Sequence, residues 1–141
     1  MVADRLTDGV RIGQLLASEV SGNEGRLRAL SLADADPDVE PTADGALAYR
    51  IVRAVDGDAT EADGHVVAEV YVQPDRVRVE FVAADAEGPD DLPTVTAAAA
   101  DEAGLRVRPK AVRPPRTLVF VEDGAQVKRA LPVLEAAVDA R

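Results

Sequence analysis

Three segments of alternating apolar and polar residues follow one another between residues 46 and 83, and they constrain the fold more than any other feature. They are LAYRIV from Leu47, HVVAEVYV from His65 and RVRVEFV from Arg76. Alternation with a period of two is typical of strands with one apolar face and one polar face. Since a short acidic loop and a Gln73-Pro74-Asp75 turn connect the segments, they predict an antiparallel meander.

Three further segments have the spacing of helices. Asp8 is a suitable cap for a helix that carries its apolar residues at helical spacing and ends near Gly22. An alanine-rich helix begins after Gly88-Pro89-Asp90 and ends before Gly104. A last helix begins at Asp123 or Gly124 and carries an apolar stripe toward the C-terminus.

The remaining alternating segments add strands on both sides of the meander. Arg26 to Leu32 predicts a short strand, Leu105 to Arg108 a second, and the run from Thr117 a third. The order becomes α-β-β-β-β-α-β-β-α. The sequence therefore predicts an α+β fold with an antiparallel sheet of five or six strands, helices packed on one face, and a single domain over residues 1–141.

Charge indicates the surroundings for which the chain is suited. The net charge is −10, and only Lys110 and Lys128 among 16 basic residues are lysine. At multimolar salt the Debye length falls to about 3 Å or less, so an acidic surface stays hydrated without strong self-repulsion. Codon bias alone explains the shortage of lysine but not the acid excess. We therefore expect a halophilic protein.

The absence of cysteine and of any long apolar run sets the expected location. Cysteine is absent, which removes disulfides and thiol chemistry and fits a reducing compartment. No run approaches the roughly 18 apolar residues of a membrane helix. The sequence therefore predicts a cytoplasmic protein that does not enter a membrane.

Two resemblances bear on these expectations. The opening DRLTDGVRIGQLLASE and the ending TLVFVEDGAQVKRALPVLEAAV, with the acidic sequence between them, resemble small uncharacterised proteins of halophilic archaea, a family without an assigned activity. The element order also looks like that of the secretion-chaperone-like fold. That second resemblance is one of fold alone, and it implies a homodimer that holds a segment of another protein.

No pattern in the chain predicts catalysis, a metal or a cofactor. Asp34, Asp36 and Asp38 begin like a calcium loop, but position six is Val39 and position twelve is Gly45. His65 is the only histidine, and a phosphate-binding glycine loop is missing. We expect no catalytic residue, no metal site and no cofactor.

One basic segment departs from the acidic background. The segment from Leu105 to Arg129 contains seven basic and two acidic residues. Its net charge is +5, and the rest of the chain carries −15. Such a cluster can bind phosphates, but it can also pair with carboxylates on the polar face of the sheet, and no aromatic residue lies among the arginines from Arg106 to Arg116. The candidate binding residues are Arg106, Arg108, Lys110, Arg113, Arg116, Lys128 and Arg129.

Small residues recur on one side of the first helix. Gly9, Gly13 and Ala17 are spaced four residues apart, so they form a row along which another backbone can approach closely. The row indicates packing of the helix on the sheet or, alternatively, a dimer contact. In either case an added methyl group at Gly13 is expected to clash.

These observations favour a non-enzymatic module that binds or adapts another protein, with a homodimer as the expected assembly. The alternative is a regulator that binds an anion or a nucleic acid through Arg106 to Arg129. An enzyme is the least favoured class, because no catalytic constellation is visible.

Overall fold

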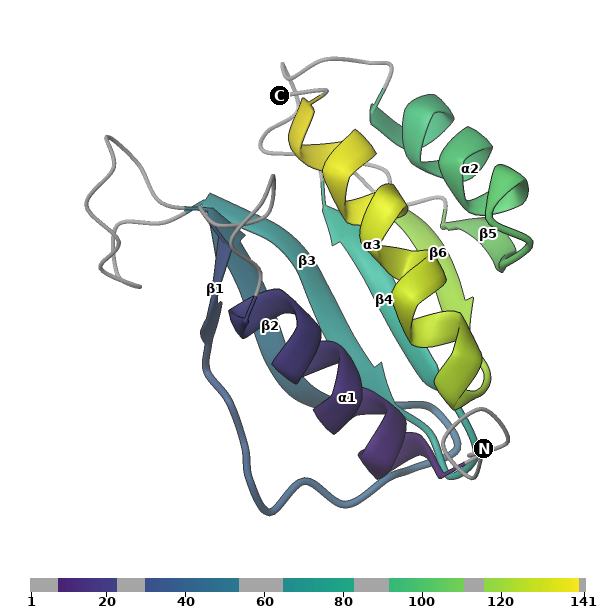
Figure 1. Cartoon of the computed structure of the whole chain (residues 1–141). Coiled ribbons are helices and arrows are strands. Elements are labelled where there is room, and N and C mark those ends of the chain that lie inside the picture. Colours follow the sequence, from purple (N-terminus) through teal and green to yellow (C-terminus); the bar gives the residue numbers. More distant parts are fainter. Residues whose placement is uncertain (1–7, 23–29, 54–64, 83–91, 111–115, 140–141) are drawn as a thin grey trace.

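The computed structural model describes residues 8–22, 30–53, 65–82, 92–110 and 116–139. The helices are α1 (Gly9–Ser21), α2 (Leu92–Glu102) and α3 (Gly124–Asp139). The strands are β1 (Leu30–Ala33), β2 (Ala46–Arg53), β3 (His65–Val72), β4 (Val77–Val82), β5 (Arg106–Lys110) and β6 (Arg116–Val121). The predicted element order is confirmed (Figure 1).

The strands form one antiparallel sheet of six strands in the order β1-β2-β3-β4-β6-β5. Strands β2, β3 and β4 are the predicted meander, and β1 pairs with β2 beside it. Helix α2 then carries the chain past the position of β6, so that β5 lies at the edge and β6 returns between β5 and β4. This crossover brings Arg116 of β6 close to the meander.

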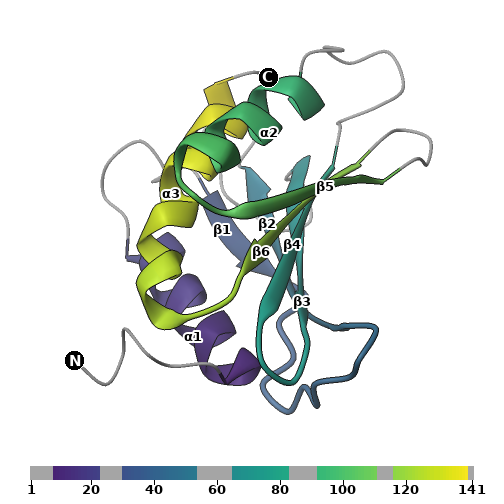
Figure 2. The ribbon, with the colours of Figure 1, turned by 90° about the vertical axis from the view of Figure 1, so that its right-hand side faces the viewer.

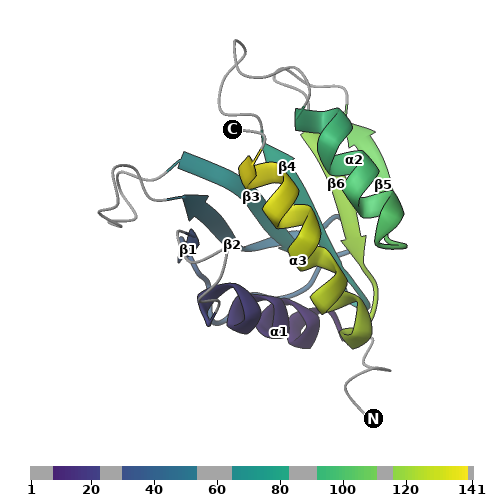
Figure 3. The ribbon, with the colours of Figure 1, turned by 45° about the horizontal axis from the view of Figure 1, so that its top comes forward.

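All three helices cover one face of the sheet, as predicted, and Figure 2 shows the layers edge-on. Helix α3 lies between α1 and α2 (Figure 3). Valines of β3, β4 and β6 form rows directly across the strands, Val72 with Val77 and Val121, and Val70 with Val79 and Val119. These rows and the apolar stripes of α1 and α3 make the core.

The caps of α1 have the predicted chemistry. The Asp8 side chain accepts a hydrogen bond from the backbone N–H of Arg11 at 3.3 Å, which satisfies one of the free donors of the first turn. The helix ends at Gly22, whose backbone N–H donates to the Ser18 carbonyl at 2.9 Å. Local residue choice therefore fixes both ends of this helix.

Several strand boundaries differ from the expectation by one or two residues. The first strand is β1, and residues 26–29 of the predicted strand lie outside the described residues. The strand predicted to stop at Arg108 continues through Pro109 to Lys110. Proline is tolerated there because β5 is an edge strand, where a missing N–H need not break the ladder.

Candidate functional site

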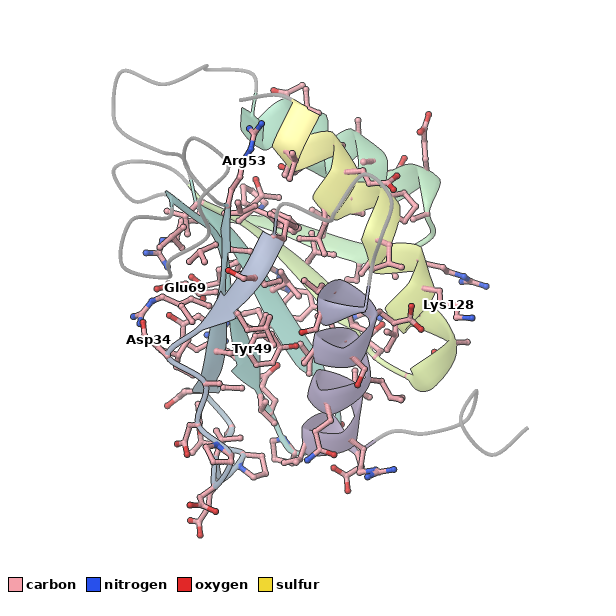
Figure 4. All side chains as sticks on the ribbon, turned by 60° about the vertical axis from the view of Figure 1, so that its left-hand side comes forward. Asp34, Tyr49, Arg53, Glu69 and Lys128 are labelled. Atoms are coloured by element: carbon pink, nitrogen blue, oxygen red, sulfur yellow. The ribbon has the colours of Figure 1, made fainter. Side chains whose placement is uncertain are left out.

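The sheet face opposite the helices carries a ladder of acidic and basic side chains. Arg50 of β2 lies directly across from Glu69 of β3, and Glu69 lies across from Glu80 of β4. Arg50 Nε donates to Glu69 at 2.8 Å, and its Nη1 donates to Asp34 at 2.6 Å. Figure 4 shows Asp34 and Glu69 close together on this side of the sheet. We call Asp34, Arg50, Glu69, Arg78, Glu80 and Arg116 the outer-face ladder.

Arg116 joins the two carboxylates at the centre of the ladder. Like charges directly across two strands repel, so the pair Glu69 and Glu80 requires a cation. Arg116 Nη1 lies 2.5 Å from Glu69 Oε1 and 3.0 Å from Glu80 Oε1. Arg78 Nε adds a contact of 2.9 Å to Glu80. The ladder has three acidic and three basic members, and its charges balance.

Glu80 is more buried than expected for a residue on the polar outer face of the sheet. The alternation of β4 predicts that Arg76, Arg78 and Glu80 face solvent, yet the Glu80 side chain is only 2% exposed. The two arginines that bind it also cover it. The outer face is therefore polar but partly dry, because long arginine side chains lie over the carboxylates.

The hydrogen bonds of the ladder set the ionisation of Glu69. Burial alone would raise the pKa of Glu69, but hydrogen bonds from Arg50, Arg116 and Tyr71 favour the charged form and hold the pKa below its usual value of 4.5. Because the folded pKa is the lower one, Glu69 stabilises the fold fully above the unfolded pKa. That stabilisation is lost as the pH falls through the folded value.

The variant Glu69→Gln tests this linkage. We expect the variant to be less stable than the wild type at pH 7, and the difference in free energy of unfolding to shrink as the pH falls below about 4.5. Urea unfolding at several pH values measures the difference. A difference that stays constant down to about pH 3 would show that Glu69 is not held ionised by its neighbours.

The structure separates the residues of the predicted basic segment. Arg106, Arg108 and Lys110 lie on β5 and Arg116 on β6, whereas Lys128 and Arg129 lie on α3 in the helix layer; Figure 4 shows Lys128 on the helix side, far from Glu69. Arg113 lies outside the described residues. The seven residues therefore do not make one continuous patch.

The cations of this segment also differ in how they are paired. Arg116 is bound to Glu69 and Glu80, and Arg106 Nε lies 3.7 Å from Glu122. Within the described part of the chain Arg108 has no ion pair. The guanidinium of Arg76 covers the Phe120 ring at 4.2 Å, so this aromatic is not free to stack on a base.

The row of small residues on α1 packs against the sheet, and its members are not equivalent. A Cβ atom on Gly9 would lie 1.8 Å from the Gln73 carbonyl oxygen. A Cβ atom on Gly13 would meet only Val72 and Val77 methyl groups, at 3.5 and 3.7 Å, which is ordinary contact. The clash expected at Gly13 therefore occurs at Gly9 instead.

Farther along the same helix the row opens onto a groove. Val10, Gly13, Gln14 and Ala17 form one wall on α1. The opposite wall comes from the segment between β1 and β2, and Leu32, Ala48, Tyr49 and Val72 form the floor. The cavity has a volume of about 330 Å³. We call it the α1 groove; sequence analysis found Gly13 and Ala17 but gave no signal for the opposite wall.

Hydrogen bonds hold both walls of the α1 groove in place. The Tyr49 hydroxyl donates to the Gly13 carbonyl at 2.7 Å, which ties the floor to α1, and burial raises the Tyr49 pKa well above its ordinary value. Figure 4 shows Tyr49 directed toward α1. In the opposite wall Asp36 N–H donates to the Ala48 carbonyl at 2.8 Å, and Gln73 Nε2 donates to the Ala43 carbonyl at 2.6 Å. The groove is thus formed before any ligand arrives.

A second hollow lies at the turn between β3 and β4 and has a volume of about 730 Å³. Its arginine is already paired: Arg76 Nε donates to Gln73 Oε1 at 2.7 Å, and Arg76 Nη1 lies 3.6 Å from Glu122. Ligand sites are usually apolar with a few polar groups free to orient the ligand. The α1 groove fits that description better.

The described ranges contain no cluster of metal ligands and no helix that could span a membrane. Among those residues no three acidic, histidine or cysteine side chains converge as metal ligands. The calcium-like start at Asp34, Asp36 and Asp38 is used otherwise, since Asp34 binds Arg50 and the Asp36 carboxylate accepts the Asp38 N–H at 2.9 Å. None of the described helices is long and apolar enough to cross a membrane.

Comparison with known proteins identifies a family without assigning an activity. No curated protein and no solved structure matches the chain significantly, so the resemblance to the secretion-chaperone-like fold stays a prediction. A family model of unknown function, DUF7993, matches residues 1–141. The chain therefore belongs to the DUF7993 family of unknown function.

Proposed function

We propose that the protein is a non-enzymatic binding module that holds an apolar side chain of a partner protein in the α1 groove. The observation that carries this proposal is the groove itself: a preformed cavity of about 330 Å³ with Val10, Leu32 and Val39 half-buried along it. Preformed apolar cavities bind with little loss of conformational entropy.

Filling the groove tests this function. Ala17 lies in the groove wall, and Ala17→Leu adds a large side chain there while keeping a good helix former. Ser18 is the neighbouring exposed position outside the groove lining, and Ser18→Leu is the matched control. We expect a protein captured from native extract by the wild type and by Ser18→Leu to be lost with Ala17→Leu. A protein retained by both variants would overturn the proposal.

The edge strand β5 supports a second candidate function, the binding of a nucleic acid. Arg106 and Arg108 are exposed there in an otherwise acidic protein, and among the described residues Arg108 has no acidic partner. Two residues apart on a strand, they point to the same side and could contact successive phosphates. Fluorescence anisotropy with a labelled single-stranded oligonucleotide at about 0.1 M salt tests this function. Binding must occur, and it must weaken in Arg106→Gln/Arg108→Gln.

The acid excess supports a halophilic, cytoplasmic protein. We expect the thermal midpoint to rise steeply between about 0.1 M and 2 M KCl, because screening removes repulsion among carboxylates that lack a cationic partner. Salt also screens the attraction within the outer-face ladder, which would lower the thermal midpoint. The central pairs of the ladder are partly buried, so this effect is smaller. Thermal unfolding followed by circular dichroism measures the midpoint, and a flat response would contradict the halophilic reading.

A homodimer remains a prediction, and the edges of the sheet bear on its form. Edge β1 has only four residues, and edge β5 contains Pro109 and exposed arginines. Short strands, proline and charge all oppose pairing between edges. A homodimer would therefore associate through another surface, and sedimentation at several protein concentrations would detect it.

A further inference from the structure

We infer that the segment held in the α1 groove is cationic as well as apolar: one large apolar side chain flanked by lysine or arginine. This inference rests on the proposed function and adds the chemistry of the partner to it. Two independent features of the groove support it: the apolar interior and the charge of the wall opposite α1.

The wall opposite α1 is formed by Ala35, Asp36, Pro37 and Val39 of the segment 34–45, and the charge of this segment is of one sign. It contains five acidic residues and no basic residue. Asp34 is bound by Arg50, but within the described residues the other four have no ion pair. All four side chains are exposed: Asp36, Asp38, Glu40 and Asp44.

Among these carboxylates Asp36 belongs to the lining of the apolar cavity, and Asp38 is two residues away in the sequence. Asp36 itself lines the groove next to Ala35, Pro37 and Val39, and its backbone is hydrogen-bonded to Ala48 of β2. Farther along the segment Arg78 Nη1 donates to the Asp44 carbonyl at 2.8 Å, which anchors its far end while leaving the Asp44 carboxylate exposed. Fixed charges beside a cavity attract ligands of opposite sign at little entropic cost.

The same electrostatics count against a second copy of this chain as the occupant. Each copy carries a net charge of −10, so apart from the exposed Arg106 and Arg108 of β5 a second copy would present mostly acidic groups to the acidic wall. Like charges across an interface raise the free energy of association. A basic partner removes this repulsion, and its apolar side chain fills the cavity.

Four synthetic peptides test the inference directly. The reference peptide is acetyl-Lys-Gly-Lys-Phe-Lys-Gly-Lys-amide; the other three replace Phe with Ala, every Lys with Ser, or every Lys with Glu. Each is titrated into the ¹⁵N-labelled full chain at about 0.05 M salt, where charges act over more than 10 Å. Changes in backbone amide shifts report both the affinity and the location of binding.

We expect the reference peptide to shift the amides of Val10, Ala17, Asp36 and Val39. Replacement of Phe should weaken binding by at least about tenfold, because burial of the ring provides most of the affinity. The Ser peptide should bind several-fold more weakly than the reference and the Glu peptide more weakly still. An affinity that decreases from the Lys peptide to the Ser peptide to the Glu peptide would indicate that the acidic wall contributes to binding.

Variants assign the effect to the wall. Asp36→Asn/Asp38→Asn removes two charges and keeps the oxygen of Asp36 that accepts the Asp38 N–H. This double variant should bind the reference peptide more weakly than the wild type does, with an affinity close to that of the peptide in which Ser replaces Lys. Its affinity for the Ser peptide should equal that of the wild type. Ala17→Leu should abolish binding of both, and Ser18→Leu should abolish neither.

The outcomes separate this inference from the proposed function. If the Lys and Ser peptides bind the groove equally, the cationic partner is refuted and the apolar binding module stands. If no peptide shifts the groove residues, or if Ala17→Leu changes nothing, both are refuted. If the chain dimerises and Ala17→Leu alone dissociates the dimer, the occupant is a second copy and the inference is wrong.

Discussion

Replacing Gly9 with alanine is expected to destabilise the fold by about 3 kcal/mol or more, the upper end of the range for overpacked sites. The new Cβ atom would lie 1.8 Å from the Gln73 carbonyl oxygen and 2.8 Å from that of Arg76. Both are backbone atoms of the turn between β3 and β4, so neither can move aside as a flexible side chain would. The helix must shift, and the hydrogen bond from Gly9 N–H to the Pro74 carbonyl would be lost.

The matched control is Gly13→Ala, one helical turn away. Its Cβ atom would make ordinary contacts with methyl groups, and alanine favours the helix over glycine. We expect stabilisation of up to about 1 kcal/mol, partly because alanine restricts the unfolded chain. Urea unfolding compares both variants with the wild type. The packing of α1 described above would be contradicted if Gly9→Ala unfolded with the same free energy as the wild type, or if Gly13→Ala unfolded with a lower one.

The second large effect is expected for Glu80→Ala. Removing one partner from a buried ion pair costs about 3–5 kcal/mol, because the remaining charge loses its compensation. Here the lower end, about 3 kcal/mol, applies, since the side chains of Arg78 and Arg116 retain 16% and 26% exposure to water. Arg116 would keep only Glu69, and Arg78 would lose its carboxylate.

Asp34→Asn is the control for Glu80→Ala within the same ladder. The Asp34 side chain is 62% exposed, and exposed ion pairs contribute about 0–1 kcal/mol. Its backbone has a positive φ of 53°, a conformation that asparagine tolerates as well as aspartate. We expect a loss below about 1 kcal/mol by urea unfolding. Equal losses in the two variants would show that burial does not control the energetics of the ladder.

Local sequence information was sufficient for the elements of the fold. Alternation in the runs from Leu47, His65 and Arg76 identified the meander, and Asp8 and Gly22 marked the ends of α1. These signals are reliable because a strand or helix determines the direction of its side chains residue by residue. The end of β5 was missed because tolerance of Pro109 depends on its place at the edge of the sheet.

Only one wall of the candidate site could be predicted from the sequence. The small residues Gly13 and Ala17 were identified, but the wall opposite them comes from a segment that carries no periodic signal. The loop of residues 34–45 appeared only as a solvated acidic connection. Its role beside α1 depends on hydrogen bonds from Asp36 to Ala48 and from Gln73 to Ala43, which join residues distant in the chain.

By itself, the sequence determined the class of fold, the order of its elements and the acidic character of the surface, because periodicity, capping and charge are local or additive properties. Only the tertiary structure decided where β5 and β6 join the sheet. By placing β6 beside β4, it brought Arg116 to Glu69 and Glu80 and left Lys128 on the other side of the sheet. Such pairing depends on contacts between distant segments, whose free energy no single segment contains.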